Sequence, residues 1–463
     1  MKYVSTRGEM PKIDFKDTVF EGLAPDGGLI VPERIPRLSE KEIEELRKLN
    51  YQELAFKIFK YYVSDIEEKD LKELIEKAYK TFRAKDITPV VKVGDIYILE
   101  LFHGPTWAFK DIALQFLGVL FEKLLLETEK KINILGATSG DTGSAAIYGV
   151  RGKKNIAIFI LHPYKKVSEV QALMMTTVTD SNIYNIAIEG TFDDCQAIVK
   201  SLFMDLKFKR KYRLTTVNSI NWARIMSQMV YYFWAYFRVS EKENCESVRI
   251  SVPTGNFGDI FAGYLTKLML GKKRIERLIL ATNENDILCR FVNKGDYSLR
   301  EVRPTISPSM DIQVASNFER YLYYFYNEDS KKTKEIMEKF AKEKAIKFSE
   351  EEVKRVQKDF LSASINQEET LETIKEFYKE TGYILDPHTA VGVKAGLKFK
   401  DKYPLICLAT AHPAKFPETV SKALGFSIKL PEEIEKLYKL PQRVEILPMD
   451  VEKVKTFISE KAI

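Results

Sequence analysis

The stretch "INILGATSGDTGSAAIYGV", residues 132–150, holds an apolar run, a loop of Gly, Ser and Thr, and a run of small residues. A short apolar run bounded by turn formers is typical of a buried strand, and the small residues after the loop favour a helix. The same strand–loop–helix order returns in runs that begin at Asn155, Asn182, Val248, Arg277 and Tyr403. Short strands that alternate with helices predict mostly parallel sheets covered by helices on both faces.

The chain has 463 residues, enough for two or three domains. Its first part differs from the rest, because amphipathic helical patterns over 40–63 and 66–82 precede two short apolar runs within 87–102. We therefore predict an N-terminal α+β domain, a large α/β domain in two segments with a charged helical insert, and a small α/β domain. Their predicted ranges are 1–90, then 91–130 with 225–463 (insert 317–380), and 131–224.

Basic and acidic residues nearly balance, with 72 Lys and Arg against 66 Asp and Glu and a net charge of +6. The two signs interleave, as in "DSKKTKEIMEKFAKEK" from Asp329, which is typical of a solvated helix face. A nucleic-acid-binding protein usually gathers its basic excess on one face or in a tail. We therefore expect no nucleic-acid partner.

The sequence predicts a cytoplasmic protein with no membrane partner. Its N-terminus lacks the apolar core of a signal peptide, and the longest apolar run, "LGVLFEKLLL" (117–126), is too short to cross a bilayer. No two of the four cysteines stand at the spacing of metal ligands. We expect buried free thiols in a reducing compartment and no metal site.

Two loops between a strand and a helix are suited to anions. In "GATSGDTG" (136–143), hydroxyls and exposed backbone N–H groups meet the positive end of a helix dipole, although a tight structural turn is the alternative. In "PTGNFGDI" (253–260), Gly255 and Gly258 allow close approach of the backbone to a ligand. Because this loop is neither a Walker loop nor Gly-x-Gly-x-x-Gly, a single phosphate fits better than ATP or a dinucleotide.

A third loop, "LATAHPAKF" (408–416), places Thr410 just beyond an apolar strand, where its hydroxyl would reach a ligand. His412 and His388 are each more simply explained as structural histidines. Asp386 is expected to cap the helix that follows it.

Lys110 lies in "LFHGPTWAFKDIALQFLG" (101–118), between a polar turn and a strongly apolar helix. The helix dipole and burial both disfavour the protonated amine there, and a neutral amine is what a Schiff base with an aldehyde needs. The alternative is that Lys110 extends to water and pairs with Asp111. Two anion loops on the same scaffold favour the first interpretation.

Six segments together resemble the threonine synthase family. They are "YVSTRG" (3–8), "GLAPDGGLIVPE" (22–33), "HGPTWAFKD" (103–111), "GATSGDTGSAA" (136–146), "PTGNFGDI" (253–260) and "TAHPAKF" (410–416). The resemblance implies the fold type II architecture of pyridoxal-5′-phosphate (PLP) enzymes. It also implies the conversion of O-phospho-L-homoserine and water to L-threonine and phosphate, by a monomer or homodimer.

The resemblance also implies roles for single residues. Lys110 would be catalytic and hold the cofactor aldehyde, and Thr410 would bind the pyridine nitrogen. The remaining residues fall into a cofactor-phosphate set, Gly255, Asn256, Phe257, Gly258 and Asp259, and a set for the substrate carboxylate, Thr138, Ser139, Gly140, Asp141 and Thr142.

Trp107 departs from the family pattern, because a smaller apolar residue is expected before Ala-Phe-Lys. Its ring either repacks the wall of the site or reshapes the substrate pocket. Lys415, Lys165 and Arg151 are candidates for the substrate phosphate. Two other functions remain open, a related phospholyase that yields 2-oxobutyrate, phosphate and ammonia, and a non-catalytic anion-binding protein on the same scaffold.

Overall fold

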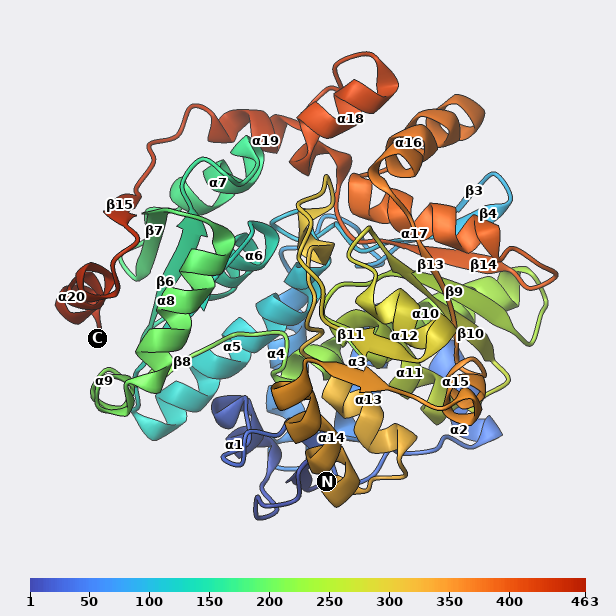
Figure 1. Cartoon of the computed structure of the whole chain (residues 1–463), viewed down its shortest axis with the longest axis horizontal. Helices are drawn as coiled ribbons and strands as arrows, with labels where there is room; N and C mark the ends of the chain where they lie inside the picture. The colour runs from blue at the N-terminus through green and yellow to red at the C-terminus, as the bar shows by residue number, and fades with distance from the viewer.

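The computed structural model describes all residues, 1–463, and places two α/β layers side by side (Figure 1). The small sheet, in the order β15-β7-β6-β5-β8, is parallel throughout. The large sheet, β13-β10-β9-β14-β4-β3, is parallel except for the antiparallel β3–β4 pair. The chain therefore has the α/β architecture with two mostly parallel sheets that the repeated strand–loop–helix pattern predicts.

The strands of the small sheet are β5 (Ile132–Ala137), β6 (Ile156–Pro163), β7 (Ile183–Glu189), β8 (Leu214–Thr215) and β15 (Glu445–Pro448). Those of the large sheet are β3 (Val90–Val93), β4 (Ile96–Glu100), β9 (Val248–Pro253), β10 (Ile275–Thr282), β13 (Phe360–Ser364) and β14 (Leu405–Ala409). Two antiparallel pairs stand apart, β1 (Tyr3–Ser5) with β2 (Ile30–Pro32) and β11 (Asp296–Ser298) with β12 (Ala345–Lys347).

The helices of the first half are α1 (Phe15–Glu21), α2 (Glu40–Arg47), α3 (Tyr51–Lys60), α4 (Glu68–Tyr79), α5 (Lys110–Thr128), α6 (Asp141–Val150), α7 (Glu169–Thr176), α8 (Phe192–Met204), α9 (Leu206–Lys211) and α10 (Trp222–Lys242). Those of the second half are α11 (Gly258–Leu270), α12 (Ile287–Lys294), α13 (Phe318–Phe325), α14 (Ser330–Glu343), α15 (Glu350–Val356), α16 (Gln367–Thr381), α17 (Pro387–Lys398), α18 (Pro417–Leu424), α19 (Glu432–Leu437) and α20 (Val451–Lys461). Two short 3₁₀ helices are η1 (Pro308–Met310) and η2 (Pro413–Lys415).

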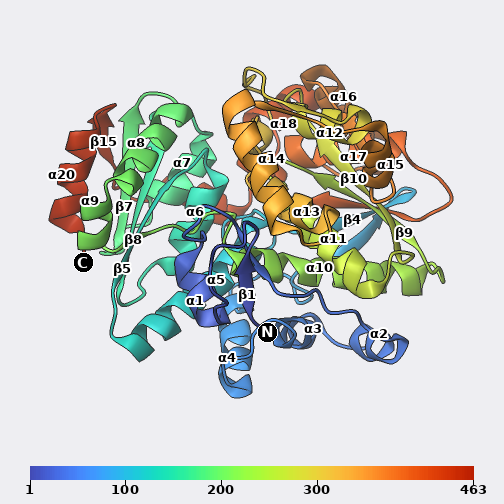
Figure 2. The same cartoon turned by 60° about the horizontal axis from the view of Figure 1, so that its bottom comes forward.

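The N-terminal helices differ from the sequence expectation in one respect. The pattern over 40–63 forms two helices, because Asn50 starts α3 with a capping box in which its side chain accepts from the Glu53 N–H. The pattern over 66–82 forms α4. Figure 2 shows α3 and α4 beneath α10 and α5, where their apolar faces join the main core of the molecule.

Two segments contribute strands that the sequence analysis did not predict. The charged region 317–380 contains β12 and also β13, which forms an edge of the large sheet. Near the C-terminus, β15 pairs with β7, and α20 packs against α8 (Figure 1). Strands β13 and β15 are short and form the edges of the large and the small sheet, so their hydrophobic pattern is weak. The division of the chain into domains stays a prediction.

Helix α5 is the element that joins the two layers. It is buried along most of its length and contacts α4, α6 and α10. At its crossing with α6 the two backbones touch, because a Cβ at Gly118 would lie 1.9 Å from the Gly149 carbonyl oxygen. A Cβ at Gly149 would likewise lie 2.5 Å from the Leu114 carbonyl oxygen. Glycine at these two positions therefore sets the distance between α5 and the small sheet.

Gly118→Ala is expected to lower the free energy of unfolding by about 1–3 kcal/mol, because the new methyl group meets backbone atoms that have no free space to move. The thermal midpoint of the purified variant measures this change. Gly136→Ala is the matched control, since a Cβ there meets only the Ile160 Cδ1 atom at 3.6 Å. Equal midpoints for the two variants would show that the α5–α6 crossing is not closely packed.

Candidate active site

Lys110 is the first residue of α5, and its side chain is only 9% exposed. The amine does not extend to water, and its Nζ atom lies 3.7 Å from Asp141 Oδ2. Burial lowers the pKa of Lys110, and the nearby positive charges of Lys415 and Arg224 act in the same direction against the opposing pull of Asp141. Burial thus makes this amine easier to deprotonate than an exposed lysine, as a nucleophilic lysine requires.

Asp111 is not the partner of Lys110. Its carboxylate accepts hydrogen bonds from the Thr106 backbone N–H and the Thr106 hydroxyl, each at 2.7 Å. Burial raises the pKa of Asp111 to about 6. The alternative of a solvent-exposed Lys110–Asp111 pair is therefore wrong, and Asp111 instead closes the turn that leads into α5.

A short antiparallel backbone pairing brings the third loop to Lys110. The Phe109 N–H donates to the Thr410 carbonyl at 2.8 Å, Ala108 bridges Ala411, and the His412 N–H donates to the Trp107 carbonyl at 3.0 Å. The Thr410 N–H donates to the Thr389 hydroxyl at 3.2 Å. These bonds use the N–H and the carbonyl of Thr410, and its hydroxyl has no hydrogen-bond partner in the protein.

The loop after β9 presents unpaired backbone donors at the start of α11. The N–H groups of Gly255, Asn256, Phe257 and Asp259 meet no acceptor within the protein, and the Gly258 N–H donates to Asn256 Oδ1 at 2.8 Å. Phe257 has a left-handed backbone with φ of 66°. Consecutive amides at a helix N-terminus form a concave site for a phosphate.

Two side chains of this loop point away from that concave site. Asp259 Oδ1 accepts from the hydroxyls of Tyr231 at 2.5 Å and Tyr232 at 2.7 Å, and burial raises the pKa of Asp259 to about 6. The Phe257 ring packs among aromatic side chains of the core, including Phe318 and Phe360. Both residues therefore offer only their backbone to an anion.

The loop after β5 has the same character. Thr138 Oγ1 accepts from the N–H groups of Gly140 at 3.0 Å and Gly143 at 2.8 Å, while those of Ser139, Asp141 and Thr142 find no acceptor within the protein. Gly140 has a φ of 135°, and a Cβ there would lie 2.4 Å from the Gln171 side chain. The free amides at the N-terminus of α6 suit a carboxylate.

The Asp141 side chain is tied to the large sheet. It lies 2.7 Å from Lys415 Nζ and accepts from Gln171 Nε2 at 2.9 Å. Lys415 is fully buried and also donates to the Thr106 carbonyl at 2.8 Å. Burial alone would raise the pKa of Asp141, but Lys415 and Lys110 outweigh it and hold that pKa well below its usual range.

The three candidates for a substrate phosphate occupy different places. Lys415 has the partners just described, Lys165 is exposed, and Arg151 forms a surface ion pair of 2.8 Å with Asp180.

A cation that the sequence analysis missed is nearer the site. Arg224, in the first turn of α10, is 3% exposed, donates from Nη1 to the Val217 carbonyl at 3.0 Å and has no carboxylate partner.

Burial lowers the pKa of Arg224 to about 10, and its Nε atom has no hydrogen-bond partner. A signal for this residue was present in the sequence, since Arg224 is the one charge in the otherwise apolar or neutral run from Trp222 to Phe237. A buried, unpaired guanidinium is costly in a folded protein unless an anion joins it.

Trp107 packs with its ring against Arg83, His412 and an apolar cluster. Its backbone has a φ of 60°, its ring lies 3.7 Å from the Arg83 guanidinium carbon, and it meets His412 edge-on at 4.8 Å. It also borders a cluster with Met174 and Ile434, so it joins α7 and α19. Burial lowers the pKa of His412 to about 4, and its Nδ1 atom accepts from the Ala414 N–H, so His412 is a neutral structural histidine.

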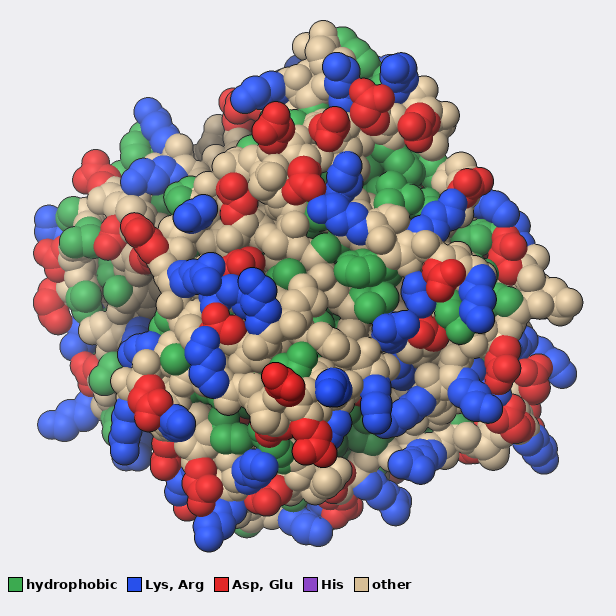
Figure 3. Space-filling model, turned by 45° about the vertical axis from the view of Figure 1, so that its right-hand side comes forward, with side chains coloured by type: hydrophobic (Ala, Val, Ile, Leu, Met, Phe, Trp, Pro, Cys, Tyr) green, Lys and Arg blue, Asp and Glu red, His purple; other side chains and the backbone are tan.

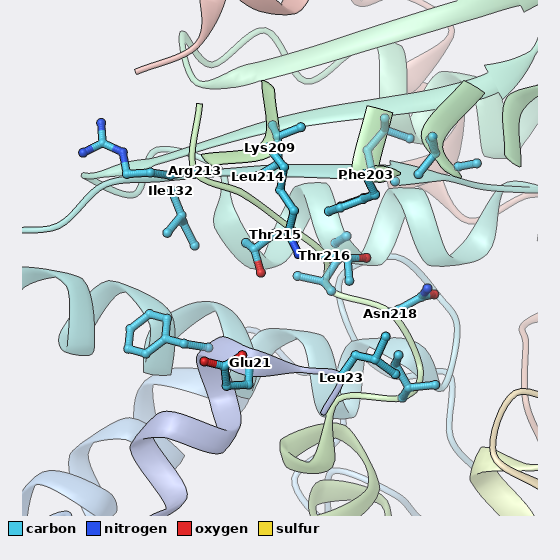
Figure 4. A pocket seen from close by; sticks show the side chains of 18 of the residues that line it. Glu21, Leu23, Ile132, Phe203, Lys209, Arg213, Leu214, Thr215, Thr216 and Asn218 are labelled. Atoms are coloured by element: carbon cyan, nitrogen blue, oxygen red, sulfur yellow. The ribbon is translucent and has the colours of Figure 1, made fainter. Parts of the chain in front are cut away.

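A cavity of about 940 Å³ lies beside the site, between α1 and the small sheet (Figure 4). Figure 4 shows Glu21 and Leu23 on one wall and Phe203, Lys209 and Leu214 on the other. Thr138 and Thr142 are among the residues that line it, whereas Lys110 is not. The cavity thus reaches the loop after β5 but is separate from the lysine.

Basic and acidic side chains are interspersed over the face in Figure 3. No group of three or more His, Cys, Asp and Glu stands where it would hold a metal ion, and all four cysteines are free, with Cys245 partly exposed. No helix is long and apolar enough to cross a membrane.

A family model for pyridoxal-phosphate-dependent enzymes matches residues 79–347, a region that includes Lys110 and both amide-lined loops. The chain is therefore a PLP-dependent enzyme, and its two parallel sheets are those of fold type II. The models named threonine synthase N terminus and threonine synthase, C-terminal match residues 2–79 and 389–458. The chain belongs to the threonine synthase family, as the six sequence segments predicted.

Individual relatives agree over the whole length. Threonine synthases of Pseudomonas aeruginosa and Saccharomyces cerevisiae are each 46% identical to this chain, and each alignment covers 99% of it and 98% of the relative. A crystal structure of PLP-bound threonine synthase from Brucella melitensis superimposes with a TM-score of 0.95 at 42% identity, covering 100% of this chain and 99% of the other. The fold and the cofactor class are thereby confirmed, while the roles of single site residues stay predictions.

Lys415→Met is expected to destabilise the protein by about 3–5 kcal/mol, because it leaves the buried Asp141 carboxylate without its nearest cation. The thermal midpoint should recover in part in Lys415→Met/Asp141→Asn, since the second change removes the stranded charge. Lys398→Met is the matched control, because its 2.8 Å pair with Glu369 is half-exposed and should contribute less than about 1 kcal/mol. Midpoints that fall additively in the double variant would contradict the pairing.

Proposed function

We propose that this chain converts O-phospho-L-homoserine and water to L-threonine and phosphate, with Lys110 holding the cofactor aldehyde. The observation that carries the proposal is the position of the Lys110 amine. It is buried, has a lowered pKa and lies 3.7 Å from Asp141 of the loop after β5. Its charge acts on Asp259 of the loop after β9, and the residue before this lysine pairs with the Thr410 backbone. The two loops and Thr410 would each meet a different part of a phosphorylated pyridine aldehyde and its amino-acid substrate.

The residues present fit the cofactor. Four unpaired N–H groups at the start of α11 suit its phosphate, and the free Thr410 hydroxyl suits its ring nitrogen. When bound, the pyridoxal ring supplies a sink for the negative charge that develops at the substrate Cα. Because a threonine hydroxyl does not require a protonated ring nitrogen, proton transfer depends more on Lys110 than it would beside an aspartate.

The substrate has two anionic ends, and the site offers a place for each. The free amides of Ser139, Asp141 and Thr142 would bind its carboxylate. Arg224, a buried cation without a carboxylate partner, would bind its phosphate. Lys415 holds Asp141 in place and so keeps the carboxylate site at a fixed distance from Lys110.

Lys110 is the group that would move protons. Its Nζ would remove the proton from the substrate Cα, release that proton, and then remove one from Cβ, while the bond between Cγ and the phosphate oxygen breaks and its electron pair leaves with the phosphate. Cγ would then gain one proton, the OH of a water molecule would add at Cβ, and Cα would regain a proton, while the other proton of the water leaves with the phosphate. The buried surroundings of Lys110 limit the access of further water.

Two parts of the proposal rest on the sequence and its resemblance alone. They are a cytoplasmic location and a monomeric or homodimeric state. Sedimentation of the purified protein would decide the second.

The test is product analysis after incubation of the purified protein with PLP and O-phospho-L-homoserine. We expect threonine and phosphate in equal amounts from the wild type, and neither product from Lys110→Ala, which should also lose the absorption band of the lysine-bound cofactor. Full turnover in Lys110→Ala would contradict the assignment. If the products are phosphate, 2-oxobutyrate and ammonia, the role of Lys110 stands but the chain is a phospholyase. If the protein stays colourless with PLP and shows no turnover, the non-catalytic alternative is favoured.

Gly255→Val should raise the dissociation constant for PLP by at least about tenfold, because a Cβ at Gly255 would lie 2.6 Å from the Ser309 carbonyl oxygen and displace the amide-lined loop. Titration of cofactor-free protein, followed by absorbance, measures the constant. Gly382→Ala controls for strain elsewhere, since its φ is 73° and no atom lies within 4 Å of the new methyl group. An unchanged constant in Gly255→Val would refute the phosphate site.

A further inference from the structure

Beneath the site lies a buried carboxylate that none of the roles above uses. Asp386 caps α17, as the sequence predicted, by accepting from the backbone N–H groups of His388 and Thr389 at 3.0 Å each. It is 1% exposed and also accepts from two side chains, His388 Nδ1 at 2.8 Å and the Thr389 hydroxyl. Four donors thus converge on two oxygens, which is more than a helix cap requires.

One arm of this network leads to the cofactor ring site. The Thr389 hydroxyl donates to Asp386 Oδ1, so its oxygen is oriented to accept from the Thr410 N–H at 3.2 Å. The Thr410 carbonyl in turn accepts from Phe109, one residue before Lys110. Asp386 therefore fixes the backbone that carries the Thr410 hydroxyl.

The other arm leads to the phosphate site. Because His388 Nδ1 donates to Asp386, the neutral ring has Nε2 as its acceptor, and Nε2 accepts from the Ser309 N–H at 3.2 Å. The Ser309 carbonyl oxygen packs directly against Gly255, 2.6 Å from where a Cβ would stand. Asp386 therefore also fixes, through His388, the segment that supports the amide-lined loop after β9.

We propose that Asp386 is a positioning residue that holds both ends of the cofactor site, Thr410 through Thr389 and the Gly255 loop through His388 and Ser309. The inference rests on the proposed placement of the cofactor. An amide at position 386 offers one acceptor oxygen and one NH₂ group, so it cannot accept from both side chains. In Asp386→Asn the NH₂ group replaces one of the two oxygens and faces the donors of either His388 or Thr389. The hydrogen bonds of that residue must then rearrange.

The two arms predict different effects, because pyridoxal lacks the phosphate of PLP. His388→Leu removes the acceptor of the Ser309 N–H and should raise the dissociation constant for PLP about tenfold, while that for pyridoxal changes by less than about twofold. Thr389→Val should change both constants by less than about threefold but shift the absorption band of the bound cofactor and lower kcat, and Thr389→Ser should restore both. Asp386→Asn should show at least one of these two signatures.

The experiment is titration of cofactor-free wild type and variants with PLP and with pyridoxal, with thermal midpoints recorded in parallel. Asp450→Asn is the matched control, because Asp450 caps α20 by accepting from two backbone N–H groups and lies far from the site. Asparagine caps a helix about as well as aspartate. A purely capping role therefore predicts that Asp386→Asn behaves like Asp450→Asn, and that outcome would overturn the proposal.

Other results are equally decisive. If His388→Leu raises the dissociation constants for PLP and for pyridoxal equally, the assignment of His388 to the phosphate end of the site is overturned. If Asp386→Asn does not fold, the results for His388→Leu and Thr389→Val decide the test. Wild-type protein that binds neither compound would overturn the proposed function and this inference together. Wild-type binding with unchanged constants and spectra in all three variants would overturn only the inference.

Discussion

The ion pair between Asp141 and Lys415 is the contact on which the geometry of the site depends. Asp141 is the first residue of α6, which follows strand β5 of the small sheet, and Lys415 lies in the segment after strand β14 of the large sheet. Lys415 Nζ and Asp141 Oδ1 are 2.7 Å apart, and both side chains are almost fully buried. Both charges are desolvated, so neither is tolerated without the other. Because Lys415 also holds the Thr106 carbonyl, the pair fixes the turn before Lys110 as well. One contact thereby sets the spacing between the carboxylate site and the catalytic amine.

The topology explains why the other groups arrive at the same place. In a parallel sheet all strands end at one edge, and ligands bind where the loops leave that edge. One amide-lined loop follows β9 and Thr410 follows β14, both in the large sheet, whereas the other amide-lined loop follows β5 in the small sheet. Strand β4 runs parallel to β14, so the segment that leads to Lys110 leaves the same end of the large sheet, where residues 107–109 pair with 410–412. The site is thus assembled from four segments that are distant in the sequence.

The sequence predicts those features whose cause is local. Glycines between an apolar run and a helix favour an anion loop or a tight turn, and Lys110 is conspicuous because it opens an apolar helix. What the sequence could not predict depends on distant partners. The Asp259 carboxylate bonds to tyrosines of α10, and the Asp141 carboxylate bonds to Lys415. Arg224 stands out in the sequence as a lone charge in an apolar run, but the structure is needed to show that it has no carboxylate partner. Strands β13 and β15 were missed because sheet pairing, not their own pattern, defines them.

The buried charges of the site differ in whether they have a partner. Lys415 is paired with Asp141, whereas Arg224 has no carboxylate partner, and burial lowers the pKa of Lys110 and raises those of Asp111 and Asp259 to about 6. A buried guanidinium without an anion opposes folding. A group that binds only the folded state stabilises it. The unpaired Arg224, which is costly to bury, is therefore also the group that an anionic ligand would stabilise.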